Sequence, residues 1–261
     1  MVKVIVTGAA GKVGSAILRL ALADKDVEVT GVLETKGHPL VGKPVEGAVK
    51  SSPPVADDLA AMTPWCDVII DFTGPEASLA HFRLAAAKGK AIVIGTTGFS
   101  DEALREMENT PGARAVISPN MSVGMNLMFD IVEKVSKTLQ DDYDIEIVEM
   151  HHRLKKDSPS GTAVKLMEIA ESARPDKDWQ EVFGRKGLIG ERKHNEIGVL
   201  ALRGGDVVGE HTVMFAGTGE RLEITHRAYS RDNFARGAIL AAKWIADKGP
   251  GIYTMKNVLG L

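Results

Sequence analysis

Apolar positions in the first 120 residues occur as short uninterrupted runs rich in Val and Ile. These runs lie at residues 2–6, 68–70, 91–94 and 115–117. Segments with helical spacing separate them, at residues 15–23, 75–88 and 101–108. Strands that are covered on both faces of a parallel sheet have this continuous apolar pattern. The first part of the chain therefore predicts an α/β fold built on a covered parallel sheet.

The pattern changes after Asn120. Helices are predicted at residues 125–139 and 234–246, a strand at 144–152, a long loop at 174–195, and further strands at 198–203, 209–215 and 220–227. Apolar and polar residues alternate clearly in the last strand, as in a half-exposed strand. In the strand at 144–152 the alternation slips at Ile147-Val148, which a bulge would explain. Glycine-containing turns separate the last three strands, so this part predicts an α+β domain with a mostly antiparallel sheet.

Glycines follow the first predicted strand at the spacing G-x-x-G-x-x-G, as Gly8, Gly11 and Gly14. With the helix at 15–23 and a strand at 27–34, they lie in a βαβ unit of about 30 residues. The first glycine permits a tight turn, the second lets the backbone approach a pyrophosphate, and the third allows close packing of the helix. The spacing is not the most frequent one, so the motif is moderately specific. Its context predicts a Rossmann dinucleotide-binding domain.

Glu34 stands 20 residues beyond Gly14, at the end of the second predicted strand. An acid at this place can bond the adenosine ribose hydroxyls, and its charge repels a 2′-phosphate. We therefore expect NAD(H) as the preferred cofactor. NADP(H) remains possible because Lys12 and Lys36 can offset the charge of Glu34. The competing interpretation of Glu34 is an exposed charge at a strand end.

The other strands of the first part end in small or hydrogen-bonding residues. These ends read Asp71-Phe72-Thr73-Gly74, Gly95-Thr96-Thr97-Gly98 and Ser118-Pro119-Asn120. Ligands of open α/β sheets bind outside the carboxyl ends of the strands. The three strand ends therefore predict the place of a nicotinamide ring, although any one of them could simply be a loop.

The densest group of reactive side chains is the run from His151 to Thr162. Ser160 is a candidate N-cap, and the N–H groups of the helix start behind it suit an anion at Ser160, Gly161 and Thr162. Histidine exchanges protons near neutral pH, and Lys155 adds a positive charge. The run thus predicts a site that holds a carboxylate and moves a proton. A solvated basic surface beside an ordinary helix cap is the alternative.

Composition excludes several classes of protein. The 261 residues carry a net charge of −3, which argues against broad nucleic-acid binding. The single Cys66 excludes an intrachain disulfide and predicts a buried structural thiol in a reducing compartment. No apolar run approaches 18 residues, so we expect no membrane span and a cytoplasmic protein. The histidines have no compact metal-ligand spacing, so no metal is expected.

The motifs together closely resemble the dihydrodipicolinate reductase family, also called 4-hydroxy-tetrahydrodipicolinate reductase. The resemblance rests on the glycine motif, the three strand ends, the run from His151 to Thr162, and Gly209-Glu210-His211-Thr212. It covers nearly the whole chain. The run His-His-x-x-Lys-x-Asp-x-Pro-Ser-Gly-Thr is its most specific part.

The resemblance implies an NAD(P)H-dependent oxidoreductase that forms tetrahydrodipicolinate from 4-hydroxy-tetrahydrodipicolinate in lysine and diaminopimelate biosynthesis. It implies His151 as the acid/base residue, Lys155 as the proton donor, and His152, Ser160, Gly161 and Thr162 as contacts of a cyclic dicarboxylate. The implied cofactor contacts are Gly8, Ala9, Ala10, Gly11, Lys12, Val13, Glu34, Gly95, Thr96, Thr97, Ser118, Pro119, Asn120 and Met121. It also implies a dinucleotide-binding domain at residues 1–122 and 231–261, and a substrate-binding domain at 123–230 whose sheet assembles a homotetramer.

One departure and three alternatives remain. Many relatives place Arg directly after the acid of the second strand, but this chain has Glu34-Thr35, which favours NADH. A short-chain dehydrogenase needs Tyr-x-x-x-Lys, and no tyrosine of this chain has that lysine. A cofactor-sensing regulator should carry a basic or DNA-binding region, which the sequence lacks. A reductase-like NAD(H)-binding protein with a different or lost substrate is the remaining alternative.

Overall fold

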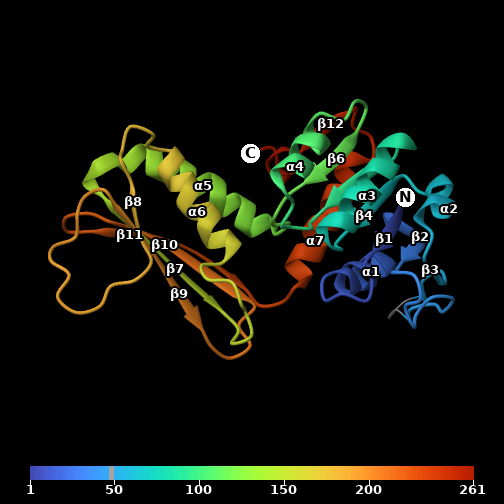
Figure 1. Cartoon of the computed structure of the whole chain (residues 1–261), viewed down its shortest axis with the longest axis horizontal. Helices are drawn as coiled ribbons and strands as arrows, with labels where there is room; N and C mark the ends of the chain where they lie inside the picture. Colours follow the sequence, from blue (N-terminus) through green and yellow to red (C-terminus); the bar gives the residue numbers. More distant parts are fainter. Residues whose placement is uncertain (47–49) are drawn as a thin grey trace. The chain divides into compact units, whose positions relative to one another are not determined.

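The computed structural model describes residues 1–46 and 50–261, which divide into two compact units. The first unit comprises Met1–Val123 and Arg231–Leu261, and the second comprises Gly124–Ser230. The chain therefore leaves the first unit after Val123 and its last segment returns to it (Figure 1).

The described part of the first unit contains a seven-stranded parallel sheet in the order β12-β6-β5-β4-β1-β2-β3. Its strands are β1 (Val2–Thr7), β2 (Val27–Leu33), β3 (Val55–Ala56), β4 (Val68–Asp71), β5 (Ala91–Ile94), β6 (Arg114–Ile117) and β12 (Gly251–Tyr253). The four strands expected from apolar runs and the strand expected at 27–34 are all present. The edge strands β3 and β12 are two and three residues long, too short to give a pattern in the sequence.

Helices cover both faces of this sheet. They are α1 (Gly14–Ala23), α2 (Leu59–Met62) with the 3₁₀ helix η1 (Thr63–Trp65), α3 (Pro75–Ala87), α4 (Asp101–Glu108), α7 (Asp232–Ile245) and α8 (Met255–Leu259). Val4 and Val6 of β1 pack in one core with residues of α1 and α7, while Ile5 packs in another with residues of α2, α3 and α4. Successive residues in the middle of a strand therefore face two different cores, which explains the continuous apolar runs.

Helix α7 belongs to the first unit because of close packing. Its buried positions are mostly small, and Ala235, Ala238, Ala241 and Ala242 are fully buried. A Cβ on Gly237 would lie 1.7 Å from the main-chain oxygen of Met121. Helix and backbone can approach this closely only because a side chain is missing there.

The second unit has a five-stranded sheet in the order β11-β10-β7-β9-β8 within its described residues. The strands are β7 (Asp144–His151), β8 (Gln180–Val182), β9 (Glu196–Arg203), β10 (Gly209–Ala216) and β11 (Arg221–Ala228). The helices α5 (Val123–Leu139), followed by the 3₁₀ helix η2 (Gln140–Asp142), and α6 (Gly161–Ser172) pack on one face. The α/β plus α+β fold class is confirmed (Figure 1).

Four details of the second sheet differ from expectation. Pairings of β10 with β11 and β7 are antiparallel, but β9 pairs with β7 and β8 in parallel, so the sheet is mixed. Strand β7 lies between β9 and β10, so the turn after β9 does not close a hairpin. The predicted loop at 174–195 contains β8, and the predicted bulge in β7 is absent from its described residues, which alternate strictly in burial. Val148 breaks the sequence pattern because it is an apolar residue on the face away from the helices.

Candidate active site

The glycine loop of the first unit depends sterically on two of its three glycines. Gly8 has a φ of +65°, and a Cβ there would lie 2.5 Å from the main-chain oxygen of Phe72. A Cβ on Gly14 would lie 2.0 Å from the oxygen of Gly8. For Gly11 the nearest described atom would be 3.1 Å away. The first and third glycines thus let the turn form, while Gly11 leaves an exposed stretch of backbone.

Helix α1 begins directly behind this loop. Among the described residues, no side chain caps its first turn and no acid lies in it. Residues 10–12 are exposed in front of the helix. Main-chain N–H groups at the positive end of a helix dipole suit a phosphate group. The loop can therefore hold the pyrophosphate of a dinucleotide.

Glu34 contacts the glycine loop across 24 residues of sequence. Its carboxylate accepts a hydrogen bond from the main-chain N–H of Ala10 at 2.6 Å and another from Thr35 at 3.2 Å. The structure thus brings Glu34 to the loop, as its spacing from Gly14 suggested. A ribose hydroxyl near the loop would meet this carboxylate.

The ends of β1, β4 and β5 are tied together by Asp71, to which the sequence analysis gave no role. The buried carboxylate accepts hydrogen bonds from Thr7 at 2.8 Å, Thr73 at 2.9 Å and Thr96 at 3.2 Å, and it pairs with His81 Nδ1 at 2.5 Å. Burial alone raises the pKa of Asp71, but the hydrogen bond with His81 and those from hydroxyls outweigh it and lower the pKa. The threonines at the neighbouring strand ends were the sequence feature from which this hydrogen-bond network could have been predicted.

The predicted cofactor residues of the later strand ends differ in what they expose. Thr96 is buried, and its hydroxyl is used on Asp71 and on the main-chain N–H of Thr73. Met121 is a core residue with 1% of its surface exposed. Thr97 and Pro119 are exposed. Thr96 and Met121 can therefore contact a cofactor mainly through their backbone, whereas Thr97 and Pro119 present side chains.

In the second unit, His151 lies at the end of β7 on the face that α5 and α6 cover. It is 9% exposed, and its Nδ1 atom lies 2.7 Å from the carboxylate of Glu149. Glu149 also pairs with Arg203 of β9 at 2.7 Å. Neither partner was identified from the sequence. The signal for Glu149 was its place two residues before His151, because residues at that spacing in a strand share a face.

Helix α6 begins where it was predicted. Ser160 is its N-cap, and the hydroxyl accepts a hydrogen bond from the N–H of Ala163 at 3.2 Å. The same hydroxyl lies 3.0 Å from Nε2 of His211, and Ser160 is only 1% exposed. Gly161 is exposed and Thr162 half-buried. The hydroxyl of Ser160 therefore organises the helix start, while residues 161 and 162 form its accessible surface.

The loop that follows β7 carries Lys155. Its ammonium group lies 2.9 Å from the carboxylate of Asp157. The loop is held to the sheet by hydrogen bonds from Arg203 to the carbonyl of Asp157 and from His152 to the carbonyl of Val207, both at 2.7 Å. The second unit thus holds a cation, a histidine and a helix start in one continuous segment.

Two buried side chains next to His151, Glu149 of β7 and His211 of β10, have strongly lowered pKa values. Burial raises the pKa of Glu149, but hydrogen bonds from His151, Arg203 and the Ser160 amide outweigh it and lower the pKa to about 2. Burial and the neighbouring His151 lower the pKa of His211 to about 3. At neutral pH Glu149 is therefore ionised and His211 is uncharged.

These pKa values predict that the fold loses stability in acid. His211 takes up a proton near pH 6.5 in the unfolded chain but only near pH 3 in the folded chain. As the pH falls from 6.5 toward 3, protonation therefore favours the unfolded chain, and the free energy of unfolding decreases. Glu149 contributes about 3 kcal/mol above pH 4.5, which is lost toward pH 2. Urea unfolding at several pH values should show a free energy that falls below pH 6.5. A His211→Gln variant should flatten the upper part of this fall, whereas His194→Gln, at an exposed position, should not; a constant free energy down to pH 4 would contradict the assignment.

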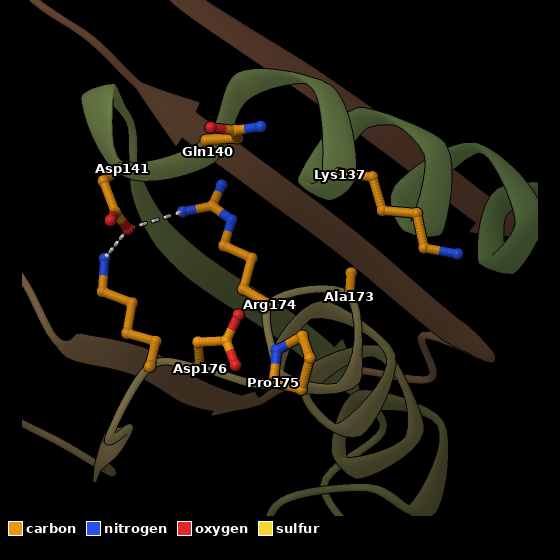
Figure 2. A pocket seen from close by; sticks show the side chains of 8 residues that line it. Lys137, Gln140, Asp141, Ala173, Arg174, Pro175 and Asp176 are labelled. Carbon is orange, nitrogen blue, oxygen red and sulfur yellow. Dashed lines mark hydrogen bonds and ion pairs between the residues drawn. The ribbon is translucent and has the colours of Figure 1, made fainter.

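A cavity of about 340 Å³ elsewhere in the second unit has no comparable chemistry (Figure 2). Asp141 at its rim already pairs with Lys177 at 2.6 Å and lies 4.0 Å from Arg174. Its described lining residues include no histidine, cysteine or hydroxyl side chain. Across the described chain, no group of three or more His, Cys, Asp or Glu side chains is placed to hold a metal, and no helix has the length and apolar character to cross a bilayer.

Comparisons with known proteins agree with this geometry. The family model for the N-terminus of dihydrodipicolinate reductase matches residues 2–121, and the model for its C-terminus matches residues 124–259. A 4-hydroxy-tetrahydrodipicolinate reductase of Syntrophus aciditrophicus is 51% identical over 100% of this chain and 99% of the relative. One of Syntrophobacter fumaroxidans is 50% identical over the full length of both chains.

A solved structure extends the comparison to three dimensions. Dipicolinate-bound dihydrodipicolinate reductase from Paenisporosarcina sp. TG-14 superposes with a TM-score of 0.76 and 25% identity, covering 99% of this chain and 100% of the other. Sequence and fold thus agree along the whole chain. The chain belongs to the dihydrodipicolinate reductase family.

Proposed function

We propose that the protein reduces 4-hydroxy-tetrahydrodipicolinate to tetrahydrodipicolinate with NAD(P)H, in lysine and diaminopimelate biosynthesis. The observation that carries this proposal is His151, held by a buried carboxylate beside the start of α6. This arrangement offers a proton and an anion site together, as the reduction of a cyclic dicarboxylate requires. The full-length relatives named for this reaction support the substrate.

The residues of the first unit fit a dinucleotide. The exposed backbone at Gly11 and the uncapped start of α1 suit the pyrophosphate of a dinucleotide. A side chain at Gly11 would take up part of the space over this backbone. The cofactor-binding residues that we propose are Gly8, Ala9, Ala10, Gly11, Lys12, Val13, Glu34, Gly95, Thr96, Thr97, Ser118, Pro119, Asn120 and Met121. When bound, the cofactor supplies a hydride.

The residues of the second unit supply the proton and bind the substrate. A proton donor near an atom that gains electron density accelerates such a step by about 10²–10⁴-fold. We assign this role to His151 as acid/base and to Lys155 as proton donor. His152, Gly161 and Thr162 would hold the dicarboxylate, since main-chain N–H groups at a helix start and a nearby cation stabilise carboxylates. Ser160 would contribute by fixing the start of α6, because its N–H donates to Glu149 and its hydroxyl caps the helix.

The open face of the second sheet supports assembly as a homotetramer, which we propose together with a cytoplasmic location. Val148, Leu200 and Met214 are half-buried on this face, and Leu202 is 51% exposed. Opposing apolar sheet faces would bury these side chains. The buried thiol of Cys66 is compatible with a reducing compartment.

A steady-state assay with each cofactor tests both the reaction and the cofactor preference. We expect oxidation of NADH that depends on 4-hydroxy-tetrahydrodipicolinate, and a higher kcat/KM with NADH than with NADPH. The carboxylate of Glu34 lies at the glycine loop and would repel a 2′-phosphate. Glu34→Gln should keep hydrogen bonding but raise kcat/KM with NADPH about tenfold relative to NADH, a change of about 1.4 kcal/mol.

Two outcomes would contradict these proposals separately. A clear preference of the wild type for NADPH would overturn the role of Glu34 but leave the reaction in place. Cofactor binding without turnover of this substrate would instead favour a reductase-like protein that acts on another substrate. A Glu28→Gln variant, in the same strand β2, controls for loss of a negative charge near the cofactor domain's surface.

A further inference from the structure

The carboxylate of Glu149 bonds to His151 and to the Ser160 amide in addition to its ion pair with Arg203. One carboxylate oxygen accepts from the Ser160 amide at 2.9 Å and from Arg203 Nη2 at 2.8 Å. The other lies 2.7 Å from His151 Nδ1 and accepts from Arg203 Nη1 at 2.7 Å. The side chain is fully buried. One carboxylate thus joins three segments: the end of β7, the end of β9 and the start of α6.

The contact between the Glu149 carboxylate and Nδ1 of His151 determines which ring nitrogen carries a proton. Glu149 is ionised at neutral pH, and an ionised carboxylate only accepts hydrogen bonds. Nδ1 of His151 must therefore be the donor. The other ring nitrogen, Nε2, is left for the reaction, and when the ring is protonated Nε2 donates as well.

Gly209 borders Nε2 of His151. A Cβ on Gly209 would lie 2.9 Å from Nε2, so any larger residue at this position would crowd the nitrogen. The ring of His211 meets the His151 ring edge-on, with centroids 5.1 Å apart. Burial keeps His211 neutral, so it adds no repulsion when His151 is protonated.

The same carboxylate also sets the place of the anion site. It accepts the N–H of the N-cap Ser160, so the start of α6 is fixed relative to His151. Arg203 adds a hydrogen bond to the carbonyl of Asp157, the residue that pairs with Lys155. A buried ion pair gains little stability over apolar packing, so a role in positioning explains this network better than a role in stability.

We propose that Glu149, neutralised by Arg203, is a positioning residue that directs the proton of His151 through Nε2 and aligns the anion site of α6 with it. The proposal rests on the reductase function proposed above. In this arrangement one side chain holds both the acid/base residue His151 and the backbone at the start of α6. Among the described residues, His151 contacts Glu149 of β7 and His211 of β10, Arg203 of β9 pairs with Glu149, and Lys155 of the following loop and His226 of β11 act on the pKa of His211.

Glu149→Gln tests the proposal because it keeps the shape and one acceptor oxygen but removes the charge. We expect kcat/KM to fall roughly 10²-fold. The pH profile of kcat/KM should change, because the ring loses the carboxylate that holds its Nδ1 proton. KM for the dicarboxylate should rise, while KM for NADH stays unchanged.

Glu146→Gln is the matched control. Glu146 lies on the same strand, three residues away on the opposite face, and it also pairs with arginines, Arg185 at 2.9 Å and Arg192 at 3.0 Å. Both variants remove the charge of a β7 glutamate that pairs with arginine. Only the Glu149 variant should change the pH profile and the KM for the dicarboxylate.

A second measurement is independent of turnover and of the folding of the variant. ¹⁵N NMR of the wild-type imidazole should show His151 protonated at Nδ1 at neutral and higher pH. Protonation at Nε2 alone would overturn the proposal, as would a folded Glu149→Gln enzyme with an unchanged pH profile and KM. If the wild type has no activity on this substrate, the proposed function fails while the NMR result still decides the role of Glu149.

Discussion

His151→Gln is expected to lower kcat/KM with the dicarboxylate substrate by about 10²–10⁴-fold, which is the contribution of a well-placed proton donor. Glutamine can accept from or donate to its neighbours but cannot release a proton near neutral pH. The ring lies in the second unit, on the same face of β7 as Glu149. Affinity for NADH, measured by fluorescence titration, should remain nearly unchanged because the proposed cofactor-binding residues belong to the first unit.

Lys155→Ala should have an effect of the same order, since it removes the cation of the same loop. Lys156→Ala is the matched control, because Lys156 is the adjacent and exposed lysine. For His151 the control is His194→Gln, at an exposed position of the same unit. Unchanged turnover in both His151→Gln and Lys155→Ala would end the catalytic assignment of this segment.

Gly14→Ala is expected to destabilise the first unit by about 3 kcal/mol and to abolish measurable cofactor binding. The added Cβ would lie 2.0 Å from the main-chain oxygen of Gly8 and 2.7 Å from its carbonyl carbon. Backbone atoms cannot rotate away as a flexible side chain can. Alanine gains at most about 1 kcal/mol in helix propensity, which does not offset this overlap.

Gly11→Ala separates the fold from the binding of the cofactor. Its Cβ would approach the Gly8 oxygen only to 3.1 Å, so thermal unfolding should change little. The methyl group would hinder the approach of a pyrophosphate to the exposed backbone of the glycine loop, so the affinity for NADH should fall about tenfold, or about 1.4 kcal/mol. Equal stability of Gly14→Ala and wild type would show that the turn can relax and would refute the steric argument.

Local patterns in the sequence were sufficient for much of the fold. The five main strands of the parallel sheet were predicted because each packs apolar residues on both faces. The N-cap at Ser160 and the glycine loop were predicted because a cap and a tight turn depend on few neighbouring residues. The family was predicted because its motifs are long and specific, and the comparisons confirm it.

Other features depended on contacts between distant residues. The expected antiparallel arrangement of three late strands missed that β7 inserts between β9 and β10, because strand order depends on tertiary packing. The short strands β3, β8 and β12 form only because a neighbouring strand offers an edge. Thr96 stays a predicted cofactor contact, and only the structure shows that its hydroxyl is used on Asp71, 25 residues earlier.

The sequence by itself therefore determined the cofactor fold, the family and the segment from His151 to Thr162 that carries the proposed chemistry. Only the tertiary structure decided how that segment can work. Glu149 could be placed on the face of His151 by its spacing, but Arg203 comes from a strand 54 residues away. Burial alone would raise the pKa of this carboxylate, and Arg203, His151 and the Ser160 amide together keep it ionised. Charge pairing across the sheet thus fixes the proton on His151, and chain folding alone brings the pair together.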